Sequence, residues 1–266
     1  MSKIRIKNCG SITKGFNEDT EIECYGGNIL DSIYIVMPAY NEEANIKEVV
    51  KKWYPLLDGK SEKSRLLVAD SGSVDRTHEI LLGLKDDYPK LEIVSDCEKQ
   101  HGPKLIRLYK KSIEDDVDYV FQTDSDGQTD PKEFDDFWKK RKEFDAILGN
   151  RTKRGDGKLR ALVEKVVCIL LCLFFGVKVP DANAPFRLMK VSMLKKYIDR
   201  FSETYNLPNI MLTCFFAYYK EKICFCEISF GARKAGKNSI NIRRIAGIGI
   251  KAVKDFCDFR RGMKNA

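Results

Sequence analysis

The sequence predicts an α/β protein with a mostly parallel sheet that is flanked by helices. From Ile33 to Gly149, short apolar runs that fit buried strands alternate with longer stretches that fit helices. Clusters of polar residues follow several of the apolar runs directly, and ligands of open parallel sheets gather outside the carboxyl ends of the strands. With 266 residues, 43% of them hydrophobic, the chain is long enough to bury a core of its own.

The predicted elements alternate along the chain. The expected strands are short and apolar, and they cover Ile33–Met37, Arg65–Ala69, Leu91–Ser95, Tyr119–Thr123 and Ala146–Gly149. The expected helices lie between them and cover Glu43–Tyr54, Asp75–Leu84, Pro103–Ile113 and Pro131–Phe144. Strands that alternate with helices in this way pair in parallel, and helices cover both faces of their sheet.

Three segments are expected. Residues 1–31 are polar and form an N-terminal extension, residues 32–239 form the main domain, and residues 240–266 form a basic amphipathic helix. This last helix is expected to lie on an anionic membrane surface, to dock on the main domain or to form an oligomer contact. The longest apolar run, Val166–Val177, is shorter than the ~20 residues of a membrane-spanning helix, so we expect a buried core helix or a helix in the membrane interface.

Composition narrows the class of function. Lys and Arg outnumber Asp and Glu by 47 to 39, which favours anionic partners such as nucleotides or phospholipid head groups. The nine cysteines include no C-x-x-C pair and follow no secretory signal, which favours reduced thiols in a cytoplasm and gives no reason to expect zinc. The sequence has neither the Gly-rich nucleotide motifs of P-loop and dinucleotide-binding proteins nor the aromatic-interleaved basic strands of nucleic-acid binders.

An acidic triplet follows the strand that ends at Thr123. Asp124, Asp126 and Gln128 occupy alternate positions, so an extended backbone presents their side-chain oxygens on one side. Mg²⁺ and Mn²⁺ prefer such oxygen ligands and are usually shared with substrate phosphates. The triplet therefore predicts a site for Mg²⁺ or Mn²⁺ beside a phosphorylated ligand, although a solvated acidic turn would have a similar sequence.

Two further polar motifs follow the first and second strands, at Pro38–Glu43 and Asp70–Thr77. Asp70 can accept hydrogen bonds from the N–H groups of a uracil or guanine base, whereas Ser73 and Thr77 fit a turn and a helix cap. Because the carboxyl ends of parallel strands share one edge of a sheet, these motifs are expected to meet the acidic triplet in one crevice.

These motifs, in their order along the chain, resemble those of family-2 glycosyltransferases of the Rossmann-like GT-A fold, most closely the polyprenyl-phosphate and dolichol-phosphate sugar synthases. The resemblance runs from Ile33 to about Ser239. Besides the motifs above, it rests on Gly102–Lys104, Gly149–Arg151, Asp181–Arg187 and Arg233–Ser239.

The resemblance implies roles for individual residues. The implied donor-binding residues are Pro38, Ala39, Tyr40, Glu42, Val68, Asp70, Lys104, Asp124, Ser125 and Asp126, and the implied metal ligands are Asp124, Asp126 and Gln128. The implied phosphate-binding residues are Arg151, Lys165, Arg233 and Lys237, and the implied catalytic residues are Asp181 and Arg187. The chain departs from the family pattern at Lys165, where the family usually has Arg, at Ala184–Pro185, and at Asn238–Ser239, where the family often has Ser-Lys.

The acceptor class depends on whether a general base is present. A hydroxyl acceptor must lose its proton to a positioned carboxylate, whereas a lipid phosphate is already ionised near neutral pH. The acceptor motif has one acid, Asp181, which either orients an arginine or acts as a base. The sequence therefore favours an inverting, metal-dependent transfer from a UDP- or GDP-sugar to a polyprenyl phosphate. We expect the enzyme in the cytoplasm, either free or as a peripheral protein on the cytoplasmic face of the membrane, and the sequence does not indicate its oligomeric state. The alternatives are a soluble transferase acting on a glycan or protein hydroxyl and a non-catalytic nucleotide-sugar-binding scaffold.

Overall fold

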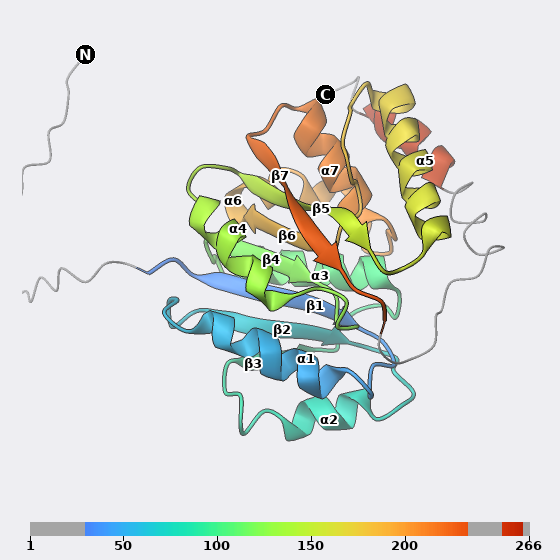
Figure 1. Ribbon diagram of the computed structural model, residues 1–266. Coiled ribbons are helices and arrows are strands. Elements are labelled where there is room, and N and C mark those ends of the chain that lie inside the picture. The colour runs from blue at the N-terminus through green and yellow to red at the C-terminus, as the bar shows by residue number, and fades with distance from the viewer. Residues whose placement is uncertain (1–29, 234–251, 263–266) are drawn as a thin grey trace, which may run out of the picture.

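The computed structural model describes residues 30–233 and 252–262 (Figure 1). The strands are β1 (Ile33–Ala39), β2 (Arg65–Asp70), β3 (Leu91–Val94), β4 (Tyr119–Thr123), β5 (Ala146–Arg154), β6 (Phe186–Lys190) and β7 (Ile223–Phe230). The helices are α1 (Ile46–Trp53), α2 (Thr77–Gly83), α3 (His101–Glu114), α4 (Phe134–Lys140), α5 (Lys158–Phe175), α6 (Val191–Leu194) and α7 (Pro208–Tyr218). Short 3₁₀ helices are η1 (Tyr54–Leu57), η2 (Pro131–Glu133) and η3 (Ile198–Arg200), and residues 252–262 form a further helix.

The strands form one sheet in the order β3-β2-β1-β4-β6-β5-β7. Its ladders are parallel except for those of β6, which lies antiparallel between β4 and β5. The carboxyl ends of β1, β2, β4, β5 and β7 therefore share one edge of the sheet with the amino end of β6. The predicted mostly parallel α/β sheet is confirmed, whereas β6 and β7 were not predicted as strands.

The sheet has a hydrophobic core on each face because alternate strand residues point to opposite sides. Ile35 of β1 and Val68 of β2 pack on the face that α1, α2 and α4 cover. Val36 and Leu67, their neighbours in the sequence, pack on the face covered by α3, α5 and α7. Both faces are buried, which explains why the strands read as continuous apolar runs.

The predicted helices are present, with shifted ends. The helix expected from Pro131 begins as η2, with the proline in its first turn, and continues as α4 from Phe134. The helix expected from Pro103 begins two residues earlier, at His101. Gly102 permits this start, because a Cβ at this position would lie only 2.4 Å from the Cα of Asn206. Because Asn206 is far from Gly102 in the sequence, the residues around Gly102 do not reveal this contact.

The apolar run from Val166 lies mainly in α5, which ends at Gly176 in a left-handed conformation. Its inner face, with Leu171 and Phe175, belongs to the core, but the opposite face is exposed. No helix among the described residues is long and apolar enough to cross a bilayer.

The described part of the C-terminal segment docks on the main domain. Phe256 is buried, and its ring centroid lies 6.1 Å from that of Phe174 and 5.8 Å from that of Phe175. Figure 1 shows this helix, in red, beside α5. The docked alternative thus applies to residues 252–262, while the predictions for residues 1–29, 240–251 and 263–266 lie outside the described residues.

Candidate active site

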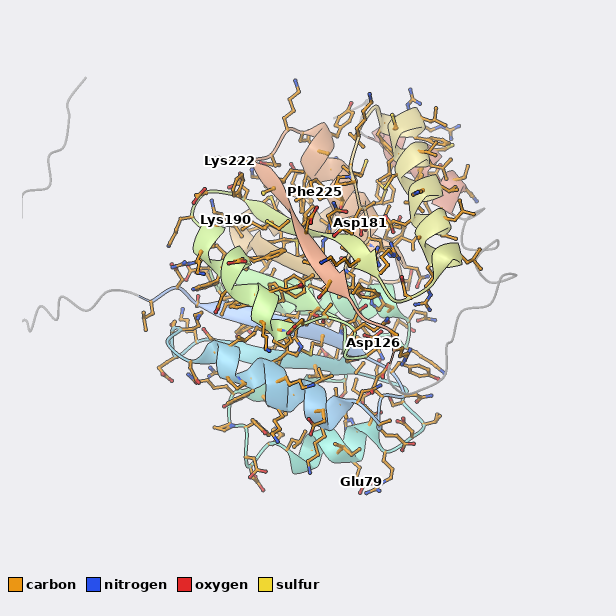
Figure 2. All side chains as sticks on the ribbon, in the orientation of Figure 1. Glu79, Asp126, Asp181, Lys190, Lys222 and Phe225 are labelled. Atoms are coloured by element: carbon orange, nitrogen blue, oxygen red, sulfur yellow. The ribbon has the colours of Figure 1, made fainter. Side chains whose placement is uncertain are left out.

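The acidic loop after β4 lies at the edge of the sheet where the parallel strands end. Oδ1 of Asp124 is 3.2 Å from Nε2 of His101 and accepts a hydrogen bond from the Gln122 side chain at 3.3 Å. Oδ1 of Asp126 accepts the backbone N–H of Gln128 at 3.1 Å. Figure 2 shows Asp126 toward the end of β7 and away from Lys190 and Lys222, which mark the opposite edge of the sheet.

The electrostatics of this loop favour a cation. Burial, together with the charge of Asp124, raises the pKa of Asp126 to about 6. A divalent cation would relieve the repulsion between the two carboxylates. No group of three or more Asp, Glu, His or Cys among the described residues could form a metal cage of their side chains alone. The two carboxylates fit Mg²⁺ or Mn²⁺ instead, since such ions take their remaining ligands from water and substrate phosphates.

Gln128 connects the acidic loop to β7. Its Nε2 donates a hydrogen bond to the backbone oxygen of Gly231 at 2.6 Å, and the Gly231 N–H donates to the backbone oxygen of Gln128 at 2.7 Å. The side-chain nitrogen of Gln128 is therefore engaged, and Oε1 is the atom with which this residue would bind a metal.

The end of β2 presents Asp70, whose carboxylate is buried. Oγ of Ser73 donates a hydrogen bond to its Oδ1 at 2.5 Å, and Nδ1 of His78 lies 3.0 Å from its Oδ2. These contacts fix the orientation of the carboxylate. The half-buried ring of Tyr40 lies nearby at the end of β1, with Nζ of Lys99 4.7 Å from its centroid.

Lys104 of α3 connects the carboxyl ends of β1 and β2. Its buried ammonium donates hydrogen bonds to the backbone oxygens of Ala39 at 2.5 Å and Ser71 at 3.0 Å. Burial lowers the pKa of Lys104, and the charge of Asp70 opposes that shift. The ammonium is thus enclosed by the protein, and the implied contact with the donor stays a prediction.

Four other implied donor residues contribute through the backbone or the core. Val68 is fully buried in the core, and the Ala39 side chain is likewise enclosed, so neither side chain is accessible to a nucleoside. The hydroxyl of buried Ser125 donates a hydrogen bond to the backbone oxygen of Pro38 at 2.8 Å and so fixes the acidic loop to β1. These residues therefore support the strand ends and the acidic loop.

Arg233, three residues after β7, reaches across the edge to the first motif. Its guanidinium forms an ion pair and a hydrogen bond with the buried carboxylate of Glu42. Burial raises the pKa of Glu42, whereas the hydrogen bond from Asn45 and the charge of Arg233 lower it. The contact brings a cation close to the acidic loop, and the charge of Arg233 offsets part of the rise in the pKa of Asp126.

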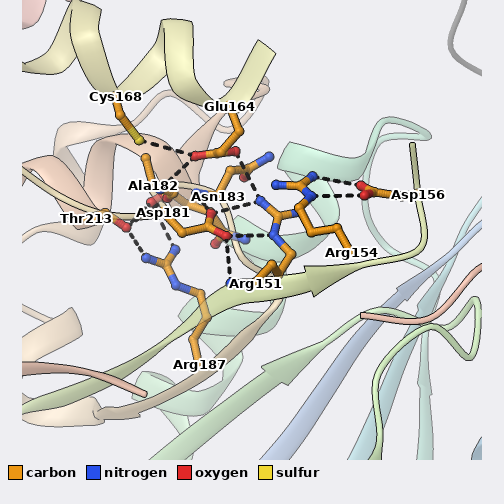
Figure 3. A network of polar contacts seen from close by, with 11 residues as sticks. Arg151, Arg154, Asp156, Glu164, Cys168, Asp181, Ala182, Asn183, Arg187 and Thr213 are labelled. Carbon is orange, nitrogen blue, oxygen red and sulfur yellow. Dashed lines mark hydrogen bonds and ion pairs between the residues drawn. The ribbon is translucent and has the colours of Figure 1, made fainter. Parts of the chain in front are cut away.

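A second cluster lies beyond the acidic loop, around Arg151 of β5 (Figure 3). Nε of Arg151 donates to Oδ2 of Asp181 at 2.7 Å, and Nη2 donates to Oδ1 of Asp181 at 2.8 Å and to Glu164 at 3.0 Å. All three side chains are at least nine-tenths buried. The loop before β6 and the helix α5 are therefore connected to β5 through one guanidinium.

Asp181 is held as a carboxylate. Burial alone would raise its pKa, but the hydrogen bonds and charge of Arg151 outweigh that effect and hold the pKa below its usual range. The backbone N–H groups of Arg151 and Asn183 donate further hydrogen bonds to it. With its oxygens engaged in this way, Asp181 orients Arg151 and is poorly suited to act as a general base.

Glu164 was not predicted from the sequence. It accepts the backbone N–H of Ala182 at 2.7 Å besides the contact with Arg151. Burial and the charge of Asp181 raise its pKa, against the attraction of Arg151. Glu164 is the one acid in the predominantly apolar sequence of α5, and that contrast is the signal that could have identified it.

The other predicted cationic residues lie in different surroundings. Arg187 is enclosed, with Nη1 donating to the backbone oxygen of Asn209 at 2.9 Å and Nη2 donating to Thr213. The catalytic role implied for it stays a prediction. Lys165 is exposed on α5, while its neighbour Glu164 faces Arg151. Lys237 lies outside the described residues.

The sequence profile of the family described as glycosyl transferase family 2 matches residues 34–220. The chain belongs to this family. The match begins in β1, ends after α7 and includes the acidic loop and the Arg151 cluster, so both halves of the site lie within the family's shared region.

Several known proteins are similar to the chain. The undecaprenyl-phosphate 4-deoxy-4-formamido-L-arabinose transferase of Shewanella sediminis is 24% identical over 67% of this chain and 54% of its own length. The UDP-N-acetylglucosamine–dolichyl-phosphate N-acetylglucosaminyltransferase of Methanococcus voltae is 27% identical over 61% of this chain and 71% of its own length. The chain spans about half the length of the first of these relatives and of a glycosyltransferase of Bacillus subtilis, of which 48% is covered.

Solved structures confirm the predicted GT-A fold. The glucosyl-3-phosphoglycerate synthase of Mycobacterium tuberculosis, in complex with Mn²⁺, UDP-glucose and glycerol 3-phosphate, superposes with a TM-score of 0.63. The alignment covers 87% of this chain and 80% of that one at 20% sequence identity. At this identity the likeness concerns the fold.

Proposed function

We propose that the protein is an inverting, metal-dependent glycosyltransferase that moves a sugar from a UDP- or GDP-sugar to a polyprenyl phosphate. The observation that carries this proposal is the arrangement of two unlike sites on one edge of the sheet. One site has crowded carboxylates that favour a cation, and the other has a carboxylate that is fully engaged with an arginine. Residues 32–239 would form the transferase domain, working in the cytoplasm or at the cytoplasmic face of a membrane.

The donor half would bind the nucleotide and its diphosphate. Asp70, whose oxygens are fixed by Ser73 and His78, would accept hydrogen bonds from a base through its remaining lone pairs. Tyr40 lies at the end of the neighbouring strand. Asp124, Asp126 and Oε1 of Gln128 would hold Mg²⁺ or Mn²⁺, which neutralises the charge that develops on the departing diphosphate. Arg233 would add a fixed positive charge from the end of β7, where it already contacts Glu42.

The contacts of Asp181 in the acceptor half favour a phosphate acceptor over a hydroxyl acceptor. A hydroxyl acceptor needs a free carboxylate to take its proton, and Asp181 is already bound to Arg151. A phosphate monoester brings its own negative charge and needs no base. Its oxygen would attack the anomeric carbon as the bond to the diphosphate breaks, and the bonding electrons would leave with the diphosphate. A single displacement of this kind inverts the anomeric configuration.

The similar proteins also support a lipid-phosphate acceptor. The names of two of them include undecaprenyl phosphate and dolichyl phosphate. Together with the engagement of Asp181 by Arg151, these names support a polyprenyl phosphate as the acceptor of this chain.

A transfer screen tests the proposal. Purified protein would be incubated with Mn²⁺ or Mg²⁺ and a panel of UDP- and GDP-sugars, each with and without a short polyprenyl phosphate, and the anomeric configuration of the product determined by NMR. We expect inverted product that requires both metal and lipid phosphate. Donor hydrolysis that is indifferent to the lipid would favour a hydroxyl-directed transferase, donor binding without any turnover would favour a scaffold, and a retained configuration would refute single displacement.

A further inference from the structure

The outer face of α5 carries a stripe of exposed apolar side chains. Ten large apolar side chains are exposed in the described part of the chain, and half of them belong to this one helix. They follow one another at spacings of three and four residues, and are Leu159, Leu162, Val166, Ile169 and Leu173. Such spacing places them on one side of a helix, and Leu173 is 70% exposed.

The charges around this stripe are asymmetric. Glu164, the only acid in the sequence of α5, points inward to Arg151 and Ala182 (Figure 3). Lys165, the next residue, is exposed. The outward surface of the helix therefore combines apolar and cationic side chains without an acid of its own.

The helix over residues 252–262 packs against α5 through Phe256. Together with α5 it borders a hollow of about 200 Å³ lined by Phe174, Cys257, Arg260 and Arg261. An apolar wall beside two arginines matches a ligand with an anionic head group and a hydrocarbon chain. The exposed charged side chains of this helix also include Lys254 and one acid, Asp258, which lies 3.8 Å from Nη1 of Arg261. Basic side chains outnumber acids among them, so the exposed charge of this helix is positive.

We propose that the α5 stripe and the adjoining basic residues of α5 and of the helix 252–262 dock on the surface of an anionic lipid bilayer. A helix with this distribution of side chains lies in the plane of the interface, with its apolar face among the head groups and upper acyl chains. The cations beside it gain from the negative potential of anionic lipids.

A second copy of the chain fits this surface less well. Helices that pair through such a stripe usually carry opposite charges beside the seam. Two copies of α5 would bring exposed Lys165 side chains together without an exposed acid of α5 to pair with them. An anionic surface complements the same side chains.

The position of this surface also deepens the proposed function. α5 holds Glu164 of the Arg151 cluster on one side and the apolar stripe on the other, so docking of the stripe would bring the acceptor half of the site close to the bilayer. This link to a lipid-phosphate acceptor rests on the proposed function. The docking itself rests on the exposed side chains alone.

Vesicle flotation of the full-length protein tests the proposal. Vesicles of phosphatidylcholine would be compared with vesicles that also contain phosphatidylglycerol, without donor or prenyl phosphate in the sample. The triple variant Leu162→Gln, Ile169→Gln, Leu173→Gln should bind vesicles at least about tenfold more weakly. The matched control, Val74→Gln with Leu82→Gln, changes exposed apolar residues outside α5 and should bind like the wild type.

A charge variant separates the electrostatic contribution. Lys165→Glu should weaken binding to the anionic vesicles by about fivefold or more, with a smaller effect at high salt. Binding to vesicles of phosphatidylcholine alone should change little in this variant. Equal losses on both kinds of vesicle would contradict the charge argument.

Other outcomes would overturn the proposal. Wild-type binding that the triple variant leaves unchanged would remove the stripe from the contact. A dimer in light scattering that the triple variant converts to a monomer would identify a second copy as the occupant, and a large loss of unfolding free energy would show that another part of the chain covers α5. Transfer to a short, water-soluble prenyl phosphate, measured in parallel, tests the proposed function separately from docking.

Discussion

The two halves of the candidate site differ in whether their buried carboxylates are neutralised by a cation of the protein. At the end of β4, Asp126 lies beside Asp124, and burial and repulsion raise its pKa to about 6. At the end of β5, Arg151 meets Asp181 and Glu164 at hydrogen-bond distance, so that cluster is compensated within the protein. The first half has carboxylates crowded at some cost in free energy, as expected of a site that is completed by a ligand cation. In the second half, the charges are balanced within the protein by one guanidinium, which connects β5, α5 and the loop before β6.

Removal of Arg151 should have the largest effect on stability. Arg151→Ala leaves Asp181 and Glu164 buried without their cation, and we expect urea unfolding to show a loss of about 3–5 kcal/mol. Arg151→Lys keeps the charge and should retain part of that stability. Arg76→Ala breaks an exposed ion pair with Glu79 and should show no measurable change. A similar stability for Arg151→Ala and the wild type would contradict the contrast between the halves.

Asp126 should show the reverse pattern, with a loss of activity and no loss of stability. Asp126→Asn removes a metal ligand and should reduce transfer by at least about 100-fold in the screen described above. Because it also removes a repelled carboxylate, the unfolding free energy measured without metal should be equal or higher. Asp136→Asn, at an exposed acid of α4, is the matched control and should alter neither quantity. Near-normal turnover of Asp126→Asn would refute the metal assignment.

The pH dependence of stability should also distinguish the halves. The pKa of Asp181 is below its usual value in the folded state, so its contribution is present above the unfolded pKa of about 3.9 and is lost as pH falls through the folded pKa. Wild type and Asp181→Asn should therefore differ by about 2 kcal/mol at neutral pH and converge in strong acid. Urea unfolding at a series of pH values measures this, and a difference independent of pH would contradict the ion pair.

Substitution of Arg187 should lower the stability of the protein without changing its affinity for the donor. Its guanidinium supports α7 through Asn209 and Thr213, and its Nε is buried without a hydrogen-bond partner among the described residues. Arg187→Lys should cost about 1–2 kcal/mol of unfolding free energy and leave nucleotide-sugar affinity unchanged in calorimetry. A large loss of donor affinity in a fully folded variant would restore Arg187 to the site.

Short motifs at strand ends made the donor half predictable from the sequence. Asp124 and Asp126 follow β4 directly, and Asp70 ends β2, so the parallel topology alone brings them to one edge. The acceptor half depends on contacts between distant segments. Arg187 lies on the unpredicted antiparallel strand β6, and only the rotation of α5 decides that Glu164 rather than Lys165 faces Arg151. Neither fact has a local signature.

Lys104 illustrates the same limit within the donor half. The sequence places it near the strand ends, and the structure confirms this position. Its ammonium nevertheless points into the protein, where it donates hydrogen bonds to the backbone oxygens of Ala39 and Ser71. Position along the chain was predictable, whereas the direction of the side chain depended on packing.

A comparison of two acceptors tests the central claim most directly. A polyprenyl phosphate and the corresponding polyprenol would be offered to the same protein with Mn²⁺ and the donor identified in the screen. Because Asp181 is bound to Arg151, we expect sugar transfer to the phosphate and none to the alcohol. Transfer to the alcohol that Asp181→Asn abolishes would contradict the account and identify Asp181 as a general base.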